Sequence, residues 1–441
     1  MKHTLSVIAV LIFTSSVGFP QTNLKDTASV YKKRVLETTE IDFLTGFYIQ
    51  DGDNAAVSGG IGTEELTDFS ATFIIYIPLN DDDILSIDAG ISAYTSASSS
   101  NIDPFDDQFG DPFVASSGAS AGDVWANITG SYSHSSDDRN NVWSAHISIS
   151  DEYDYSSFGF GASYTRRFNR KNTELNVNAN MLTDNWRPYY PIELRPFLSG
   201  GAGLDDPFFA QNTITGNLDY QPKFSDLVST GRDTYAFGIG ISQILHKNVQ
   251  GSLAVDFVQQ QGLLSTPFQR IYFADVEASF IDNFQLADDI ERLPEDRMKV
   301  AVGGRLHWYL NERFTIRAFY RYFWDDWGII SNTASIELPI KIANRFTIYP
   351  SYRFYNQTAI DYFAAANQHL STSEFYTSDY DLSAYSANQF GFGISYTDIF
   401  AKFHVGKFGL KSIDLKFYQY DRNTTFGSSM VTAGLRFVRD S

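Results

Sequence analysis

Apolar and polar residues alternate along most of the chain after Thr38. Between residues 39 and 50, for example, Ile41, Phe43 and Phe47 alternate with mostly acidic, small or polar residues. A period of two is that of a β-strand with one apolar face. The same period returns in further segments, at residues 67–77, 85–95, 124–132, 143–149, 158–164, 175–181, 235–241, 253–257, 300–310, 314–322, 336–342, 346–354, 390–396, 413–417 and 431–437. We therefore expect an all-β chain of about sixteen strands.

Short and long connections alternate between these segments. Every second connection is short, as at 78–83 and 310–312, and the others include all the long ones, such as 98–122, 186–231 and 261–296. Barrels of bacterial outer membranes have short periplasmic turns, long extracellular loops and both termini in the periplasm. A soluble all-β protein, the alternative, would not be expected to alternate in this way. The pattern predicts a transmembrane antiparallel up-and-down β-barrel.

The physical basis of this prediction is the absence of water in the bilayer. A strand in hydrocarbon must pair all its backbone groups, so the sheet has to close on itself. Side chains that face lipid must be apolar, whereas those that face the lumen can be polar. No apolar run of eighteen or more residues follows the first twenty or so positions, which excludes a helical membrane protein.

The N-terminus has the pattern of an export signal. Lys2 and His3 precede a compact apolar stretch, residues 5–13, and Ser16-Val17-Gly18 is a plausible cleavage site. We therefore divide the chain into a signal peptide (1–21), a periplasmic N-terminal segment (22–37) and an outer-membrane barrel (38–441). The expected location is the outer membrane of a Gram-negative bacterium, and the expected partners are its lipid and lipopolysaccharide and the barrel-assembly machinery.

Composition narrows the chemistry. The chain has no cysteine, which excludes disulfides, thiolate zinc sites and cysteine nucleophiles. With 33 basic and 52 acidic residues, its formal charge is −19, which argues against nucleic-acid binding. Its seven histidines are scattered and show neither metal-ligand spacing nor a nucleophile motif, so we expect no enzymatic activity and no cofactor.

Alternation also assigns charged residues to the barrel interior. If Phe314, Ile316 and Tyr320 face lipid, the arginines between them face inward. The same rule gives a basic wall of Lys299, Arg305, Arg313, Arg317, Arg321, Arg345 and Arg353. It gives an acidic wall of Glu40, Asp42, Asp68 and Asp88 on the first strands. In a closed barrel of this size, we expect the two walls to face each other.

Two interpretations of these walls compete. Opposed charges would create a transverse field across a wet pore and select for polar solutes. Alternatively, the arginines would pair with acidic groups of an inward-folded loop that plugs the barrel. Under either interpretation the charges face away from lipid, where an arginine at the midplane costs about 2–4 kcal/mol.

One predicted loop is strongly acidic. Asp103, Asp106, Asp107 and Asp111 lie close together in it. Clustered carboxylates suit calcium, a hard cation with six to eight oxygen ligands, although the spacing matches no EF-hand loop. The alternative is a solvated loop whose charge is neutralised by divalent ions that bridge lipopolysaccharide.

Several segments resemble an outer-membrane family of uncharacterised role, domain of unknown function 3570. They are Tyr48–Leu66, Glu152–Gly159, Arg167–Glu174 and Tyr190–Arg195. The resemblance covers nearly the whole mature chain and implies an exported barrel, but it supplies no substrate and no functional residues. Members of the family often accompany small lipoproteins, thioredoxin-like proteins and flavin-attaching enzymes. This association suggests a redox- or metal-related envelope system, in which any electron carrier would be a separate protein.

Two functional hypotheses follow. The first is a porin-like channel or transporter for small polar or charged solutes. The second is a non-conducting scaffold or receptor for a periplasmic or surface partner. No oligomer interface is readable in the sequence.

Overall fold

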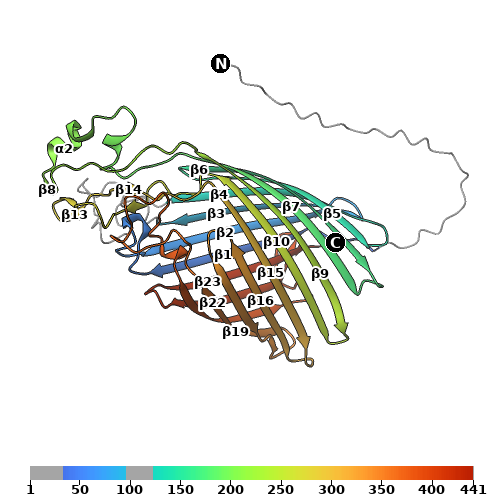
Figure 1. Ribbon diagram of the computed structural model, residues 1–441. Helices are drawn as coiled ribbons and strands as arrows, with labels where there is room; N and C mark the ends of the chain where they lie inside the picture. Colours follow the sequence, from blue (N-terminus) through green and yellow to red (C-terminus); the bar gives the residue numbers. More distant parts are fainter. Residues whose placement is uncertain (1–32, 96–122, 441) are drawn as a thin grey trace, which may run out of the picture. The chain divides into compact units, whose positions relative to one another are not determined.

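Long antiparallel strands form one continuous sheet in the computed structural model, which describes residues 33–95 and 123–440 (Figure 1). Within this part of the chain, the sheet is a closed barrel of 16 strands. The strands are β1 (Glu40–Asp51), β2 (Leu66–Pro78), β3 (Asp83–Tyr94), β4 (Asp123–Ser135), β5 (Asn141–Asp151), β6 (Tyr155–Phe168), β7 (Thr173–Trp186), β9 (Gly231–His246), β10 (Val249–Gly262), β15 (Asp296–Tyr309), β16 (Thr315–Asp325), β17 (Ile330–Glu337), β19 (Phe346–Gln357), β20 (Tyr385–Thr397), β22 (Phe408–Arg422) and β23 (Gly427–Arg439). The predicted fold class is confirmed.

The first and last strands close the barrel. β1 pairs with β2 on one side and with β23 on the other, so that Asp42 lies opposite both Ile74 and Arg436. Because every strand has two neighbours, no row of backbone groups is left unpaired at an edge.

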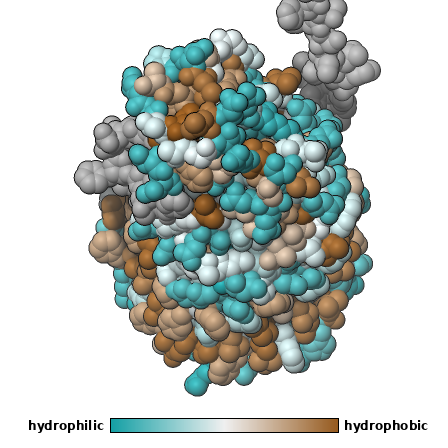
Figure 2. Space-filling model, turned by 60° about the vertical axis from the view of Figure 1, so that its left-hand side comes forward, coloured by the Kyte–Doolittle hydropathy of each residue, from teal (hydrophilic) through white to brown (hydrophobic). Residues whose placement is uncertain are grey.

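Alternation along each strand separates an outer apolar face from an inner polar face. On β6, Phe158 and Phe160 are both 53% exposed, whereas Ser157 is buried on the other face. Large apolar side chains that are this exposed in the isolated protein are those that lipid would cover. Figure 2 shows hydrophobic atoms gathered over the lower part of that view.

One strand differs from the prediction. The alternation predicted a strand at 336–342, but β17 spans Ile330–Glu337, and only the short β18 (Ile340–Lys341) follows it. Pro339 explains the break, because proline has no N–H to donate to the ladder. The start of β17 was missed because its residues are mostly small and polar, as in Ser331-Asn332-Thr333.

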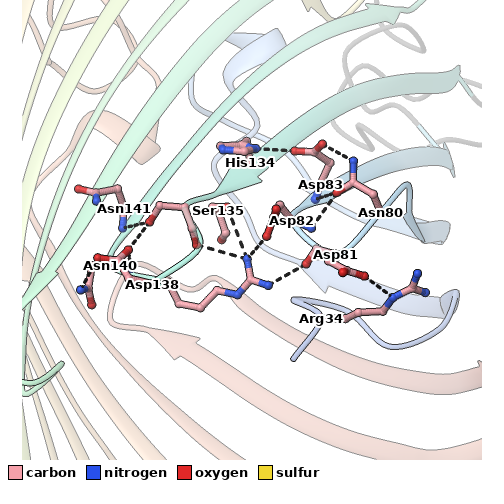
Figure 3. A network of polar contacts seen from close by, with 12 residues as sticks. Arg34, Asn80, Asp81, Asp82, Asp83, His134, Ser135, Asp138, Asn140 and Asn141 are labelled. Carbon is pink, nitrogen blue, oxygen red and sulfur yellow. Dashed lines mark hydrogen bonds and ion pairs between the residues drawn. The ribbon is translucent and has the colours of Figure 1, made fainter. Parts of the chain in front are cut away.

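Short connections lie at one end of the strands, which we call the periplasmic end because the sequence predicts that short turns face the periplasm. There a polar network joins the turn between β2 and β3 to the turn between β4 and β5 (Figure 3). Asp81 pairs with Arg34 at 2.8 Å, Asp82 with Arg139, and Asp83 with the Nδ1 of His134 at 2.6 Å. The contacts of Asp82 and Asp83 join the two adjacent hairpins, and the contact of Asp81 attaches the segment before β1 to the first of them.

The long connections form what we call the outer cap, residues 52–65, 187–230, 263–295 and 358–384. Its helices are short: η1 (Ala56–Ser58), η2 (Arg195–Phe197), η3 (Gly203–Asp205), α2 (Pro207–Gln211) and η4 (Tyr380–Leu382). Its strands are β8 (Ile214–Gly216), β11 (Arg270–Ile271), β12 (Ser279–Ile281), β13 (Phe284–Gln285) and β14 (Asp289–Ile290), while β21 (His404–Val405) lies in a periplasmic connection. Figure 1 shows α2, β8, β13 and β14 together beyond one end of the barrel strands.

Most of the buried apolar side chains in the described residues lie in the outer cap. Tyr190, Leu194 and Phe209 from one connection pack against Ile281 and Phe284 from another. The barrel has no comparable core, because its outer face is turned to lipid and its inner face is polar. None of the helices in the described residues is long and apolar enough to cross a membrane.

The predicted signal peptide (1–21) lies outside the described residues, as does most of the predicted N-terminal segment, 22–37. The first barrel strand begins at Glu40.

Candidate functional site

Ladder register identifies the side chains that face the lumen. They occupy even positions on β1, β22 and β23 and odd positions on β16 and β19, as the pairing of Asp42 with Arg436 and of Arg317 with Glu337 shows. Three cavities lined by described residues lie along these inner faces, with volumes of about 640, 350 and 540 Å³. We call them the inner cavity, the side cavity and the outer chamber, in that order.

The inner cavity brings together charges of both signs. Asp42 accepts two hydrogen bonds from Arg436, from Nε at 2.6 Å and from Nη2 at 2.7 Å. Arg317 of β16 lines the same cavity with Lys416 of β22. Sequence reasoning therefore placed Asp42 and Arg317 on walls that line one cavity, but it missed Arg436 and Lys416. Alternation on the last two strands would have pointed both of them inward.

The acidic wall is less acidic than the sequence suggested. Glu40 accepts a hydrogen bond from Lys411 Nζ at 3.2 Å, and Asp42 is paired with Arg436. Asp68 accepts a hydrogen bond from Ser92 on the neighbouring strand. Asp88 lies opposite Ile74 in the ladder. Neighbouring cations thus neutralise two of the four carboxylates locally.

The basic wall divides into paired and unpaired groups. Arg317 pairs with Glu337 at 2.8 Å, and the Arg305 guanidinium lies 5.5 Å from the ring centre of Phe319. Lys299 is the ladder neighbour of Asp325. Arg321 and Arg353 have no carboxylate partner among the residues that the structure describes. Both of them line the outer chamber.

Two arginines of the predicted basic wall are not on a strand. Arg313 lies just before β16 and Arg345 just before β19, both in periplasmic connections. Arg345 lies 3.7 Å from Asp398 in another periplasmic connection, and it donates a hydrogen bond to the Tyr396 hydroxyl at 3.1 Å. The expected wall was too long, because alternation continues a residue or two beyond the last ladder pair.

The outer chamber combines aromatic and cationic side chains. Tyrosines and arginines from five strands contribute to it, together with polar residues and with Glu64 and Asp381 from the outer cap. The tyrosines and arginines are Tyr48, Tyr355, Tyr385, Tyr418, Tyr420, Arg321, Arg353 and Arg422. Of this set, the sequence assigned only Arg321 and Arg353 to the lumen, because the chamber assembles strands that are far apart in the chain.

Arg422 joins the outer cap to the barrel wall. Its Nη1 donates to Asp381 Oδ1 at 2.6 Å, and its guanidinium lies 4.4 Å from the ring centre of Tyr385 and 4.3 Å from that of Phe426. Burial raises the pKa of Glu64, at the same chamber, to about 7. Glu64 therefore carries only a partial negative charge near neutral pH.

The outer cap holds buried charged groups. Arg270 and Glu193 are fully buried and joined by hydrogen bonds of 2.7 and 3.2 Å. Glu291, also fully buried, accepts hydrogen bonds from the Thr266 amide at 2.7 Å and the Thr377 hydroxyl at 2.5 Å. Burial raises the pKa of Glu291 to about 8 and that of Asp379 to about 6. These two carboxyl groups therefore titrate closer to neutral pH than exposed carboxyl groups do.

The candidate calcium residues Asp103, Asp106, Asp107 and Asp111 lie outside the described residues. Within residues 33–95 and 123–440, no group of three or more histidine, aspartate and glutamate side chains could hold a metal ion.

Comparisons with known proteins identify a family. A family model described as "Protein of unknown function (DUF3570)" matches residues 14–426. No curated protein matches the chain. Among solved structures, a bacterial polysaccharide outer membrane secretin has 8% identity and a TM-score of 0.44, with 92% of this chain and 99% of that chain covered.

Two further similar structures are a mutant of the ferric enterobactin receptor of Pseudomonas aeruginosa and the toluene transporter of Pseudomonas putida. The first has 11% identity and a TM-score of 0.42, with 88% of this chain and 54% of that chain covered. The second has 10% identity and a TM-score of 0.38, with 92% and 90% covered. At TM-scores below 0.5, these similarities identify neither the function nor the solute of this protein.

Proposed function

The chain belongs to the family described as protein of unknown function (DUF3570), and since that description names no solute, we propose a function from the lumen itself. We propose that the protein is a channel or transporter for small polar or charged solutes in the outer membrane of a Gram-negative bacterium. In this proposal, lipid and lipopolysaccharide surround the barrel, and the barrel-assembly machinery inserts it.

The observation that carries this proposal is the adjacency of the lumen cavities. The inner cavity and the outer chamber share Met430, and the side cavity and the outer chamber share Arg321. Charged and polar side chains line all three cavities, so water and ions can occupy them without the desolvation cost of an apolar wall.

The alternative function, a scaffold or receptor, is favoured by a different observation. The outer cap has its own apolar core, which joins two long connections through Tyr220 and Leu286 among others. Its backbone is also paired across connections, as Tyr376 and Arg292 exchange hydrogen bonds of 2.7 and 3.0 Å. A connection that only links two strands needs no such core, whereas a surface that holds a partner benefits from rigidity.

Conductance of the purified full-length protein in planar bilayers distinguishes these functions. We expect single-channel steps, because the cavities adjoin along the lumen. The matched variant replaces residues 187–230 of the outer cap with a short Gly-Ser linker and should conduct at least as well. Heat-dependent migration in gels would confirm that both proteins are folded barrels. A folded barrel that conducts in neither form would exclude the channel, and a stoichiometric partner in crosslinked envelopes would then support the scaffold.

A further inference from the structure

We propose that the outer chamber binds a small organic anion: a carboxylate or phosphate group carried on a hydroxylated ring of monosaccharide size. This inference deepens the proposed function and rests on it, because it names the class of solute that the lumen would take. The chamber's volume of about 540 Å³ is within the range of small-molecule sites, roughly 300–1,000 Å³.

The chamber has guanidinium groups with unused hydrogen-bonding capacity. Arg321 and Arg353 face it from β16 and β19, and both have exposed side chains. Neither has an ion pair or a side-chain hydrogen bond to any described residue. A guanidinium group presents a planar fork of donors that matches carboxylate and phosphate in a bidentate way. The two arginines therefore provide an open site for an anion.

Register places the two arginines within reach of one ligand. Arg321 pairs with Thr333 of β17, and Arg353 pairs with Ser335 of the same strand. Their Cα atoms are thus two strands apart and two residues apart along the ladder, which corresponds to about 12 Å at strand spacings of about 4.8 Å and rises of about 3.3 Å per residue. Two extended arginine side chains can span that distance from both sides of a small anion.

The net charge of the chamber favours anions over cations. Its three arginines face two carboxylates, Glu64 and Asp381. Asp381 is engaged with Arg422, and Glu64 is only partly ionised near neutral pH because burial raises its pKa to about 7. The chamber is therefore positive in a chain whose formal charge is −19. An anion that enters it gains attraction that the rest of the surface does not offer.

Polar and aromatic groups next to the arginines suit a hydroxylated ring. Gln389 is the ladder neighbour of both Arg353 and Tyr420. Neither the Gln389 amide nor the Tyr418 hydroxyl has a hydrogen bond to another described residue in the chamber. These two groups can bond ring hydroxyls, while the tyrosine faces offer flat apolar surface to the ring.

A glycine makes room for one of the tyrosines. A Cβ at Gly391 would lie 2.7 Å from the Cδ1 and Cε1 atoms of Tyr418. Such a contact cannot be accommodated without movement, so Gly391→Ala would displace the Tyr418 ring. A glycine at this position of β20 therefore helps to keep the chamber open.

Calorimetry on the full-length protein in detergent tests binding without relying on conductance. The probes are glucuronate for the carboxylate, glucose 6-phosphate for the phosphate, and glucose as the uncharged analogue. We expect at least one anion to bind at least tenfold more tightly than glucose. The double variant Arg321→Gln/Arg353→Gln should lose at least tenfold in affinity for it. The charge-matched control Arg170→Gln/Lys171→Gln, in the periplasmic turn between β6 and β7, should bind as the wild type does.

A second variant covers the case in which the double variant does not fold. Gly391→Ala keeps every charge and should weaken anion binding by displacing Tyr418. Equal affinity for glucose and both anions, or undiminished binding by the folded variants, would overturn the inference. Binding without conductance would instead contradict the proposed function and leave the site standing, whereas conductance without anion binding would do the reverse.

Discussion

Charged side chains of the lumen and those of the outer cap differ in how far they are buried. In the lumen, the side chain of Arg436 is 46% exposed, so its ion pair with Asp42 contributes about 1 kcal/mol or less to stability. In the outer cap, Arg270 and Glu193 are fully buried, and removal of one partner would leave an uncompensated charge at a cost of about 3–5 kcal/mol. Charged side chains of the lumen can therefore contact solutes, whereas the buried ion pair of the outer cap stabilises the fold of the cap.

Glu291 should make the stability of the outer cap depend on pH. Burial raises its pKa from 4.5 to about 8. Because the folded cap prefers the protonated form, the stabilisation is fully present below the unfolded pKa of 4.5 and is lost as pH rises through about 8. Between pH 6 and pH 9 the loss is about 3 kcal/mol.

Limited proteolysis of the cap at a series of pH values measures this effect. We expect faster cleavage within residues 263–295 at pH 9 than at pH 6, after correction for protease activity. Glu291→Gln, which cannot ionise, should flatten the profile. If the variant keeps the wild-type pH dependence, Glu291 is not the responsible group.

One long connection of the outer cap, residues 358–384, is attached directly to the barrel wall. The connection that carries η4 is held to the wall through Asp381 and Arg422, and Gln357 at the end of β19 donates hydrogen bonds to the carbonyls of Asp381 and Ser383 at 2.9 and 2.6 Å. This connection contributes Asp381 to the outer chamber. Movement of this element would therefore change access to the proposed site.

Asp381→Asn should weaken this attachment. The variant keeps the size of the side chain but removes the charge that pairs with Arg422 at 2.6 Å. In planar bilayers we expect more frequent transitions between conductance levels, and a shift of the mean conductance upward by roughly the factor of 2–5 that corresponds to about 0.5–1 kcal/mol. Asp219→Asn, at an exposed position of the outer cap, is the matched control. Identical traces for both variants would show that the ion pair does not hold the connection.

The whole molecule is shaped by two solvents, lipid outside and water inside. Ile128 and Thr129 are adjacent on β4, yet Ile128 is 51% exposed on the outer face, and Thr129 faces inward opposite Asp88 and Ser148. Moving by one residue along a strand therefore moves a side chain from the lipid-facing surface to the lumen, or the reverse.

Arginine at these two positions should have opposite consequences. Ile128→Arg puts a charge into hydrocarbon near the middle of β4 and should destabilise the folded barrel in lipid vesicles by about 2–4 kcal/mol. Thr129→Arg puts the same charge into the lumen and should cost less than about 1 kcal/mol. Denaturant unfolding in vesicles gives both values, and equal destabilisation by the two variants would contradict the assignment of faces.

The sequence by itself determined the barrel, because the two solvents impose a period of two on every spanning strand. That pattern found β1 and β16 from side chains alone, and it assigned Arg321 and Arg353 to inner faces from which both line the outer chamber. The alternation did not predict the start of β17, because small polar residues there make the two faces of the strand similar in hydrophobicity. The alternation also assigned Arg313 and Arg345 to the basic wall, because apolar and polar residues continue to alternate in the connections next to the strands.

Only the tertiary structure determined which residues the lumen and cap side chains contact. The pairing of Asp42 with Arg436 joins the first and last strands, and the outer chamber joins residues from Tyr48 to Met430. The core of the outer cap joins connections that have no periodicity to read. Closure of the sheet brings these residues together, although they are far apart in the sequence. A pattern read along the chain therefore does not reveal the contacts.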